Sequence, residues 1–159
     1  MLSVKIITVG TLKESYLRDA VAEYSKRLSA FCKLSVVQLK ESKLSDNPSE
    51  KEITQALDAE AKTILSEIPP RSYKIAMCVE GKQMPSEKLA QKLESISKET
   101  SEVCFIIGSS FGLSDKIKDI ADMRLSMSEL TFPHQLLRVM LLESIYRAFT
   151  ITAGTKYHK

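Results

Sequence analysis

The stretch Met127–Lys159, MSELTFPHQLLRVMLLESIYRAFTITAGTKYHK, decides how the chain folds and associates. It begins as a short polar loop, and Pro133 fits the first turn of a helix, where its missing N–H costs nothing. The helix that follows is apolar over more of its surface than the single stripe required against one core. Its apolar positions are Leu136, Leu137, Val139, Met140, Leu141, Leu142, Ile145, Tyr146 and Phe149. Something must cover the remaining side, and a second copy of the chain is the simplest cover.

Charged and polar side chains at this end of the chain are few. Glu143 and Arg147 have i, i+4 spacing, which is typical of a surface pair contributing a few tenths of a kcal/mol. In so apolar a helix a buried charge must be matched, so the same pair is also a functional candidate. His134, in the first turn, is more typical of a structural hydrogen bond. Tyr157 and His158 would by position alone belong to a frayed terminus.

The composition is that of one globular domain spanning residues 1–159, with 43% hydrophobic and 27% charged residues. The net charge of +3 permits a nucleic-acid partner without requiring one. No apolar run is long enough to span a bilayer, and the first residues lack the form of a signal peptide. Cys32, Cys78 and Cys104 form no spacing pattern, which favours reduced, buried thiols and a cytoplasmic location without membrane attachment.

Elsewhere, β-branched runs alternate with segments of helical spacing. The predicted strands are Val4–Val9, Leu34–Leu39, Tyr73–Val79, Val103–Ile107 and a shorter Arg124–Met127. The predicted helices are Leu12–Leu28, a segment from a capping box at Ser49 and Glu52 to Ile68, one capped by Ser86 that reaches Ile96, a short one after Ser114, and the final helix. This alternation predicts an α/β fold with a mainly parallel sheet flanked by helices.

Ligands of such sheets bind beyond the carboxyl ends of the strands. Three loops are therefore candidates together: Met77–Gly81, Gly108–Gly112 and Met127–Phe132. The glycine loop alone is more typical of a plain tight turn. Two histidines and scattered cysteines give no metal-ligand spacing, so we expect no metal, and dinucleotide, P-loop and hydrolase signatures are absent. These features predict an α/β dimer with one small-ligand site.

Five strings carry a resemblance that spans essentially the whole chain: ITVGTLKESYLRDAVAEYSKRL, CVEGKQMPSEKLA, VCFIIGSSFG, LTFPHQLLRVMLLESIYRAF and the terminal YHK. Together they resemble the RlmH (YbeA-type) family of the SPOUT methyltransferases, and the last two are highly specific. In the family two adjacent glycines usually follow the fourth strand, whereas here Ser109 follows Gly108. Met77 stands where relatives usually carry leucine, a tolerable exchange for apolar contact.

The resemblance implies an enzyme that methylates N3 of a pseudouridine in 23S ribosomal RNA, on the assembled ribosome, with S-adenosyl-L-methionine as donor. It also implies a homodimer and a C-terminal trefoil knot, which the general rules of topology would not propose. By the family's pattern, the donor contacts fall on Met77, Gly108 and the run Met127, Ser128, Glu129, Leu130, Thr131 and Phe132.

For the reaction itself, the resemblance suggests that Arg147 and the tail residues Tyr157 and His158 bind the target nucleotide, with Glu143 orienting Arg147. His158 and Glu143 both remain candidates for accepting the imide proton. Tyr157 is expected to stack on a base held out of its helix. Three alternatives stay open: a related methyltransferase with another RNA substrate, a non-catalytic ribosome-associated module, and a flavodoxin-like nucleotide binder.

Overall fold

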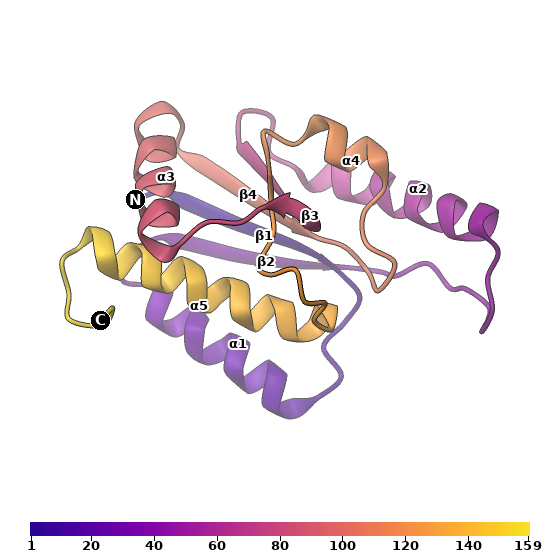
Figure 1. Ribbon diagram of the computed structural model, residues 1–159, viewed down its shortest axis with the longest axis horizontal. Helices are drawn as coiled ribbons and strands as arrows, with labels where there is room; N and C mark the ends of the chain where they lie inside the picture. The colour runs from indigo at the N-terminus through magenta and orange to yellow at the C-terminus, as the bar shows by residue number, and fades with distance from the viewer.

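The computed structural model describes residues 1–159 and shows strands and helices in strict alternation (Figure 1). The strands are β1 (Ser3–Val9), β2 (Lys33–Leu39), β3 (Tyr73–Lys82), β4 (Glu102–Ile107) and β5 (Met123–Leu125). The helices are α1 (Ser15–Leu28), α2 (Glu50–Glu67), α3 (Ser86–Glu99), α4 (Asp115–Ile120) and α5 (His134–Thr152). All strand pairs are parallel, in the order β2-β1-β4-β3-β5. The predicted α/β fold with a parallel sheet is confirmed.

The helices cover both faces of the sheet. Side chains from α1, α3 and α5 pack with one face in a large hydrophobic cluster, and side chains from α2 and α4 pack with the other face in a smaller one. Helix α5 lies between α1 and α3 and contacts both (Figure 1). Because β4 is central and covered on both faces, every residue from Val103 to Ile107 is buried, as its continuous apolar sequence predicts.

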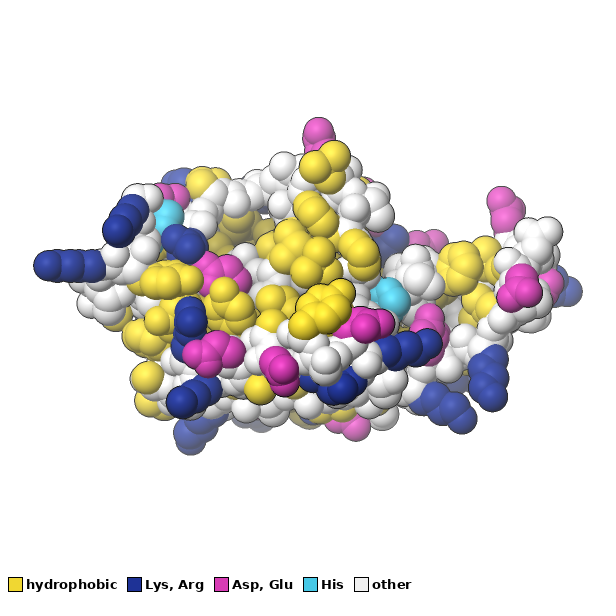
Figure 2. Space-filling model, turned by 90° about the horizontal axis from the view of Figure 1, so that it is seen from below, with side chains coloured by type: hydrophobic (Ala, Val, Ile, Leu, Met, Phe, Trp, Pro, Cys, Tyr) yellow, Lys and Arg dark blue, Asp and Glu magenta, His cyan; other side chains and the backbone are white.

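Hydrophobic side chains also remain on the surface formed by α1 and α5. Figure 2 views the molecule from this side and shows them gathered between the two histidines of the chain, which stand well apart. Tyr16 on α1 is 67% exposed and Leu136 on α5 is 37% exposed. The apolar surface of α5 is thus wider than the sheet alone can cover, as its sequence predicts.

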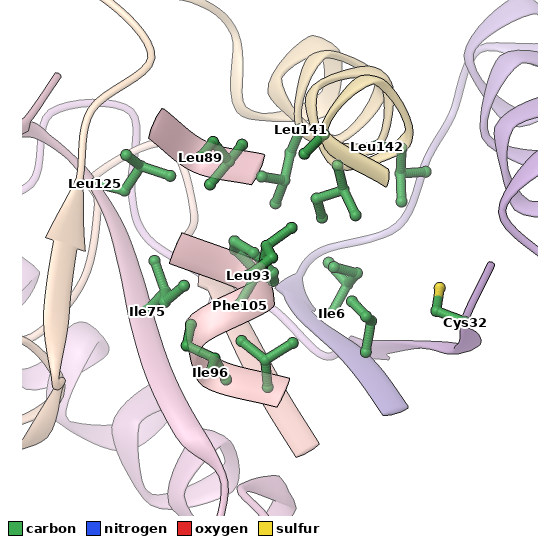
Figure 3. Packing of buried hydrophobic residues seen from close by; sticks show 14 of the residues in the cluster. Ile6, Cys32, Ile75, Leu89, Leu93, Ile96, Phe105, Leu125, Leu141 and Leu142 are labelled. Atoms are coloured by element: carbon green, nitrogen blue, oxygen red, sulfur yellow. The ribbon is translucent and has the colours of Figure 1, made fainter. Parts of the chain in front are cut away.

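The larger core joins strands to helices in close packing. Figure 3 shows Ile6, Ile75 and Phe105 of the sheet facing side chains of α3 and α5, among them Leu93, Leu141 and Leu142. Two cysteines belong to these cores, and burial raises the pKa of Cys32 to about 11 and that of Cys104 to about 12. All three thiols are free, and the two buried ones are unreactive core side chains.

The helix N-caps in the structure agree only in part with those predicted from the sequence. The capping box is confirmed: the Glu52 N–H donates to Ser49 Oγ at 3.2 Å, and the Ser49 N–H donates to Glu52 Oε1 at 3.3 Å. The predicted cap at Ser86 is wrong, because Pro85 occupies that position and Ser86 is already helical. Pro133 also precedes its helix as the N-cap instead of lying in the first turn.

Strand β3 extends further than predicted, through Gly81 to Lys82. A bulge shifts its register against β5, and a Cβ at Gly81 would lie 2.7 Å from the carbonyl carbon of Leu125. Only glycine permits this approach of two backbones, so the residue that reads as a turn signal serves strand pairing here. None of the helices combines the length and hydropathy that a bilayer crossing requires.

Candidate functional site

A pocket of about 640 Å³ opens at the carboxyl ends of β3, β4 and β5. Its walls come from the three segments that the sequence nominates, although Met77–Gly81 is part of strand β3 and not the predicted loop. Seven of the eight residues predicted to contact a donor line it, namely Met77, Gly108, Met127, Ser128, Leu130, Thr131 and Phe132. The eighth, Glu129, does not line it. The loops therefore meet at one site, which we call the donor pocket.

The loop after β4 is a tight turn that also forms a wall of the donor pocket. The Gly112 N–H donates to the Ser109 carbonyl at 2.8 Å, and Gly112 has φ +87°, in the region that favours glycine. At Gly108 a Cβ would lie only 2.2 Å from the Gly112 carbonyl oxygen. The two interpretations of this glycine loop, plain turn and ligand site, thus describe the same structure.

The loop between β5 and α5 is held by its own hydroxyl groups. Ser126 Oγ donates to the Ser128 carbonyl at 3.0 Å, and Ser128 Oγ accepts the Leu130 N–H at 3.0 Å. The Ser126 N–H also donates to the Lys82 carbonyl at 3.0 Å, which ties the loop to β3. Leu130 is 72% exposed at the mouth. The wall is therefore formed before any ligand binds.

Half of the 22 lining residues are hydrophobic, and the volume lies within the range of about 300–1,000 Å³ that is usual for small-molecule sites. Cys78 and Phe111 line it within the nominated segments, whereas Lys118 is a wall residue that sequence reasoning missed. Lys118 bridges to Glu80 at 2.6 Å, and its hydrogen bond lowers the pKa of that carboxyl group. No signal in the sequence connects Lys118 with β3, since only the fold brings them together.

The structure contains no group of three or more His, Cys, Asp or Glu side chains able to hold a metal ion.

The four residues predicted to act on the substrate form one connected group, which we call the tail cluster: Glu143, Arg147, Tyr157 and His158. Arg147 donates to Glu143 Oε1 through Nη2 at 2.7 Å and through Nε at 3.0 Å. The Tyr157 hydroxyl donates to Glu143 Oε2 at 2.9 Å, and the Arg147 guanidinium lies 4.7 Å from the centre of the Tyr157 ring. The tail folds back onto α5 instead of fraying.

His158 is fixed at both ring nitrogens. Arg147 Nη1 lies 3.2 Å from His158 Nδ1, and because arginine only donates, Nδ1 must accept. His158 Nε2 then carries the proton and faces Glu87 Oε1 at 2.8 Å. This hydrogen bond lowers the pKa of the Glu87 carboxyl group. Glu87, in the first turn of α3, is a member of this network that sequence reasoning missed.

Tyr24 of α1 is the second missed neighbour of the tail cluster. Burial, together with a hydrogen bond to Glu143, raises its pKa to about 12. Burial and Glu143 also raise the pKa of Tyr157, and the bond to Glu143 raises that of Arg147. Both phenols and the guanidinium thus keep their protons at neutral pH, and Glu143 is the negative centre that holds them together.

The donor pocket and the tail cluster lie at opposite ends of α5. His134, at the start of α5, lines the pocket, and Arg147 lies about 20 Å further along at a rise of about 1.5 Å per residue. None of the four residues of the tail cluster lines the pocket. Figure 1 shows the C-terminal tail at one end of α5 and the loop from β5 at the other. Within one chain, the residues predicted to bind the donor gather at one end of α5, and the residues predicted to act on the substrate gather at the other end.

Comparison with known proteins gives matches over the full chain. The family described as "Predicted SPOUT methyltransferase" matches residues 2–158. Proteins named ribosomal RNA large subunit methyltransferase H are similar throughout: that of Leuconostoc mesenteroides is 49% identical and that of Streptococcus thermophilus 50%, each over 99% of this chain and all of the relative. That of Bacillus pumilus is 45% identical with the same coverage.

Two solved structures share the fold at low sequence identity. A probable methylase family protein from Haemophilus influenzae matches with a TM-score of 0.54 and 14% identity, over 98% of this chain and 70% of its own. The tRNA (m1G37) methyltransferase from Aquifex aeolicus matches with a TM-score of 0.52 and 12% identity, over 91% of this chain and 69% of its own. At these identities the likeness concerns the fold alone.

Proposed function

The chain belongs to the SPOUT methyltransferase family, and from this premise we propose that it methylates N3 of a pseudouridine in the 23S RNA of assembled ribosomes. The observation that carries the proposal is the match of about 50% identity, from end to end, to proteins named ribosomal RNA large subunit methyltransferase H. The reaction would take place in the cytoplasm, where ribosomes are.

The donor pocket fits S-adenosylmethionine in size and chemistry. Met77 and Phe132 offer apolar contact for a purine, and the Ser128 and Thr131 segment offers hydroxyl and backbone groups for the polar parts. Gly108 has no side chain, so the turn after β4 can fold tightly against Gly112. When bound, the donor supplies a methyl group on an already activated sulfonium. What the chain must add is the position of the acceptor nitrogen and a destination for its proton.

We favour His158 over Glu143 as the acceptor of the imide proton. Oε1 of Glu143 already accepts hydrogen bonds from Arg147 and Tyr157, and Oε2 accepts one from Tyr157, so both oxygens are engaged. His158 Nδ1 carries a lone pair that only Arg147 contacts. If Arg147 turns to a phosphate of the bound RNA, the lone pair of His158 Nδ1 becomes free. Nδ1 can then accept the proton that N3 loses when it is methylated. Tyr157 would then hold the base by stacking.

The active site is proposed to be shared between two subunits of a homodimer. About 20 Å along α5 separate the donor pocket from the tail cluster of the same chain. The apolar surface of α1 and α5 offers a place for a second copy (Figure 2). A two-fold pairing across it can bring the tail cluster of one subunit to the donor pocket of its partner. A trefoil knot, with the C-terminal segment passing through an earlier loop, belongs to the same proposal and would hold the three pocket loops together.

Mixed dimers test the shared site. One subunit carries Thr131→Trp, which fills the mouth of the donor pocket, and the other lacks residues 157–159. Each homodimer should be inactive, whereas the mixed dimer should regain up to half of the wild-type activity, because one intact pocket meets one intact tail. Pairing Arg147→Ala with the tail deletion is the matched control and should restore nothing, since both changes damage the same cluster. Equal inactivity of both mixtures would contradict a shared site.

The proposed function is tested by mapping methylated pseudouridine in ribosomes from cells that lack this protein, before and after the purified protein is added. We expect the modification to be absent and then restored on intact ribosomes, with little transfer to free ribosomal RNA. Methylation of transfer RNA instead would favour another substrate. No binding of S-adenosylmethionine at millimolar concentration in calorimetry would favour a non-catalytic module.

A further inference from the structure

A second pocket, of about 450 Å³, lies beside the donor pocket at the carboxyl ends of β1 and β2. Ser110 and His134 line both pockets and form the boundary between them. The two differ in chemistry: half of the donor pocket's lining residues are hydrophobic, but only one of ten is hydrophobic in the second pocket. Lys13, Lys40 and Glu41 supply its charges. Its occupant must therefore be polar and must lie next to the donor.

A buried cation lies behind the wall of the second pocket. Arg138 is 4% exposed, and its Nη2 donates to the carbonyls of Val9 and Gly10 at 3.0 and 2.8 Å. Its Nε has no hydrogen-bond partner, and no carboxylate lies within 4.0 Å of its guanidinium. Burial lowers the pKa of Arg138 and the Glu41 carboxylate acts in the opposite direction, so Glu41 balances part of this buried charge. With Lys13 and Lys40 exposed at the rim, the pocket attracts negative charge.

The loop that forms the rim is held in place. Gly10 has φ +93°, and the Leu12 N–H donates to Gln38 Oε1 at 3.3 Å. Arg18 Nη1 donates to the Lys13 carbonyl at 2.7 Å, and the Lys13 N–H donates to Gln135 Oε1 at 3.5 Å. The loop is thus tied to β2, α1 and α5 together, so its position requires little ordering when a ligand binds.

Glu41 gives the second pocket a feature that a simple phosphate site lacks. Its Oε2 lies 3.3 Å from the position that a Cβ on Gly10 would take, so the carboxylate stands over the turn. A carboxylate repels a phosphate but accepts a hydrogen bond from a ribose hydroxyl. The second pocket thus has cations that can bind a phosphate and, beside them, a carboxylate that can bind a sugar hydroxyl. A ribonucleotide carries both of these groups.

His134 stands at the boundary in a form that suits contact with a base. Its imidazole makes no hydrogen bond within the chain, contrary to the structural role expected from its position. Burial lowers its pKa, with Glu41 acting in the opposite direction, so the ring is neutral at pH 7. A neutral imidazole can donate from one nitrogen and accept at the other, as the edge of a nucleobase requires.

From this arrangement we propose that the second pocket receives the ribose and phosphate of the target nucleotide, with Lys13 and Lys40 facing the phosphate and Glu41 the 2′-hydroxyl. The base then reaches past His134 into the donor pocket. The inference rests on the proposed function, because it names the place of the substrate in that reaction. It predicts that an RNA nucleotide binds this site more tightly than the corresponding DNA nucleotide.

The kinetic test uses the full-length protein, ribosomes that lack the modification, and the variants Lys13→Ala, Lys40→Ala and their combination. The double variant should lose at least tenfold in kcat/KM, and the slope of log kcat/KM against log salt should become shallower by about two, about one for each lysine. Affinity for S-adenosylmethionine should not change. Lys43→Ala, an exposed lysine outside the pocket, is the matched control and should behave as wild type. Wild-type salt dependence of the double variant would overturn the proposal.

A binding test separates this inference from the proposed function. Uridine 5′-monophosphate, titrated into protein loaded with S-adenosylhomocysteine, should shift the NMR signals of Gly10, Thr11 and His134. The 2′-deoxy nucleotide should bind several-fold more weakly, and Glu41→Ala should remove that difference. If the shifts are absent or lie elsewhere, the second pocket is not the nucleotide site. If they occur but ribosomes are not methylated, the proposed function fails and the pocket assignment stands.

Discussion

Removal of Tyr157, His158 and Lys159 is expected to lower the rate of ribosome methylation at least 100-fold while leaving the affinity for S-adenosylmethionine nearly unchanged. The deletion takes away the proposed proton acceptor, whose loss costs about 10²–10⁴-fold in a typical enzyme. It also frees Glu143 from the Tyr157 hydroxyl and Arg147 from His158. None of the deleted residues lines the donor pocket. Transfer of labelled methyl groups to ribosomes and calorimetry with the donor measure the two effects.

Three variants show which part of the tail matters. Lys159→Ala keeps both residues of the cluster and should retain activity, whereas His158→Ala alone should reproduce most of the loss. Tyr157→Phe removes only the hydroxyl that contacts Glu143, so the ring can still stack and the loss should be intermediate. Full activity of the truncated protein on ribosomes would remove the tail from the mechanism.

The fold could be predicted because its local signals agree with its long-range contacts. Strand β4 is apolar at every position from Val103 to Ile107 and lies between two neighbours with helices on both faces. The capping box at Ser49 forms where its spacing predicts, since it involves only neighbouring residues. Topology also explains the donor pocket, because the carboxyl ends of adjacent parallel strands must meet at one edge of the sheet.

Predictions failed or stopped where distant segments decide the structure. Gly81 resembles a turn residue but continues β3, since it permits the close approach of β5. Arg138 is a charged residue in an otherwise apolar helix, and it is buried with its Nη2 donating to the carbonyls of Val9 and Gly10 at the end of β1. Glu87 and Tyr24 join the tail cluster only because α1 and α3 pack on either side of α5. No local pattern marks such contacts.

Ser109, where relatives usually have a second glycine, lies in the loop after β4 and is 6% exposed. Burial raises the pKa of Glu60 on α2, against a bond from the Ser42 N–H at 2.9 Å and the effect of the nearby Ser109 hydroxyl. Oxygen Oε1 of Glu60 has no aligned hydrogen-bond partner. The serine thus has a polar neighbour, Glu60, on its buried side.

Gly108→Ala is expected to lower the affinity for the methyl donor at least 100-fold, whereas Ser109→Gly should change that affinity by only a few-fold. The new methyl group would lie 2.2 Å from the Gly112 carbonyl oxygen and 2.5 Å from its carbon. Backbone on both sides of the turn must move, which breaks the 2.8 Å bond between the Gly112 N–H and the Ser109 carbonyl. Calorimetry with S-adenosylhomocysteine measures the affinity of both variants.

Circular dichroism and thermal unfolding show whether the loss is local. Strand β4 ends at Ile107, before the turn, so the sheet and its two hydrophobic clusters should remain and secondary structure should match wild type. A Gly108→Ala protein that is folded but does not bind the donor would place the effect in the pocket wall. Binding at wild-type affinity would mean that the turn tolerates a side chain, and the close backbone approach would then have no part in holding the donor.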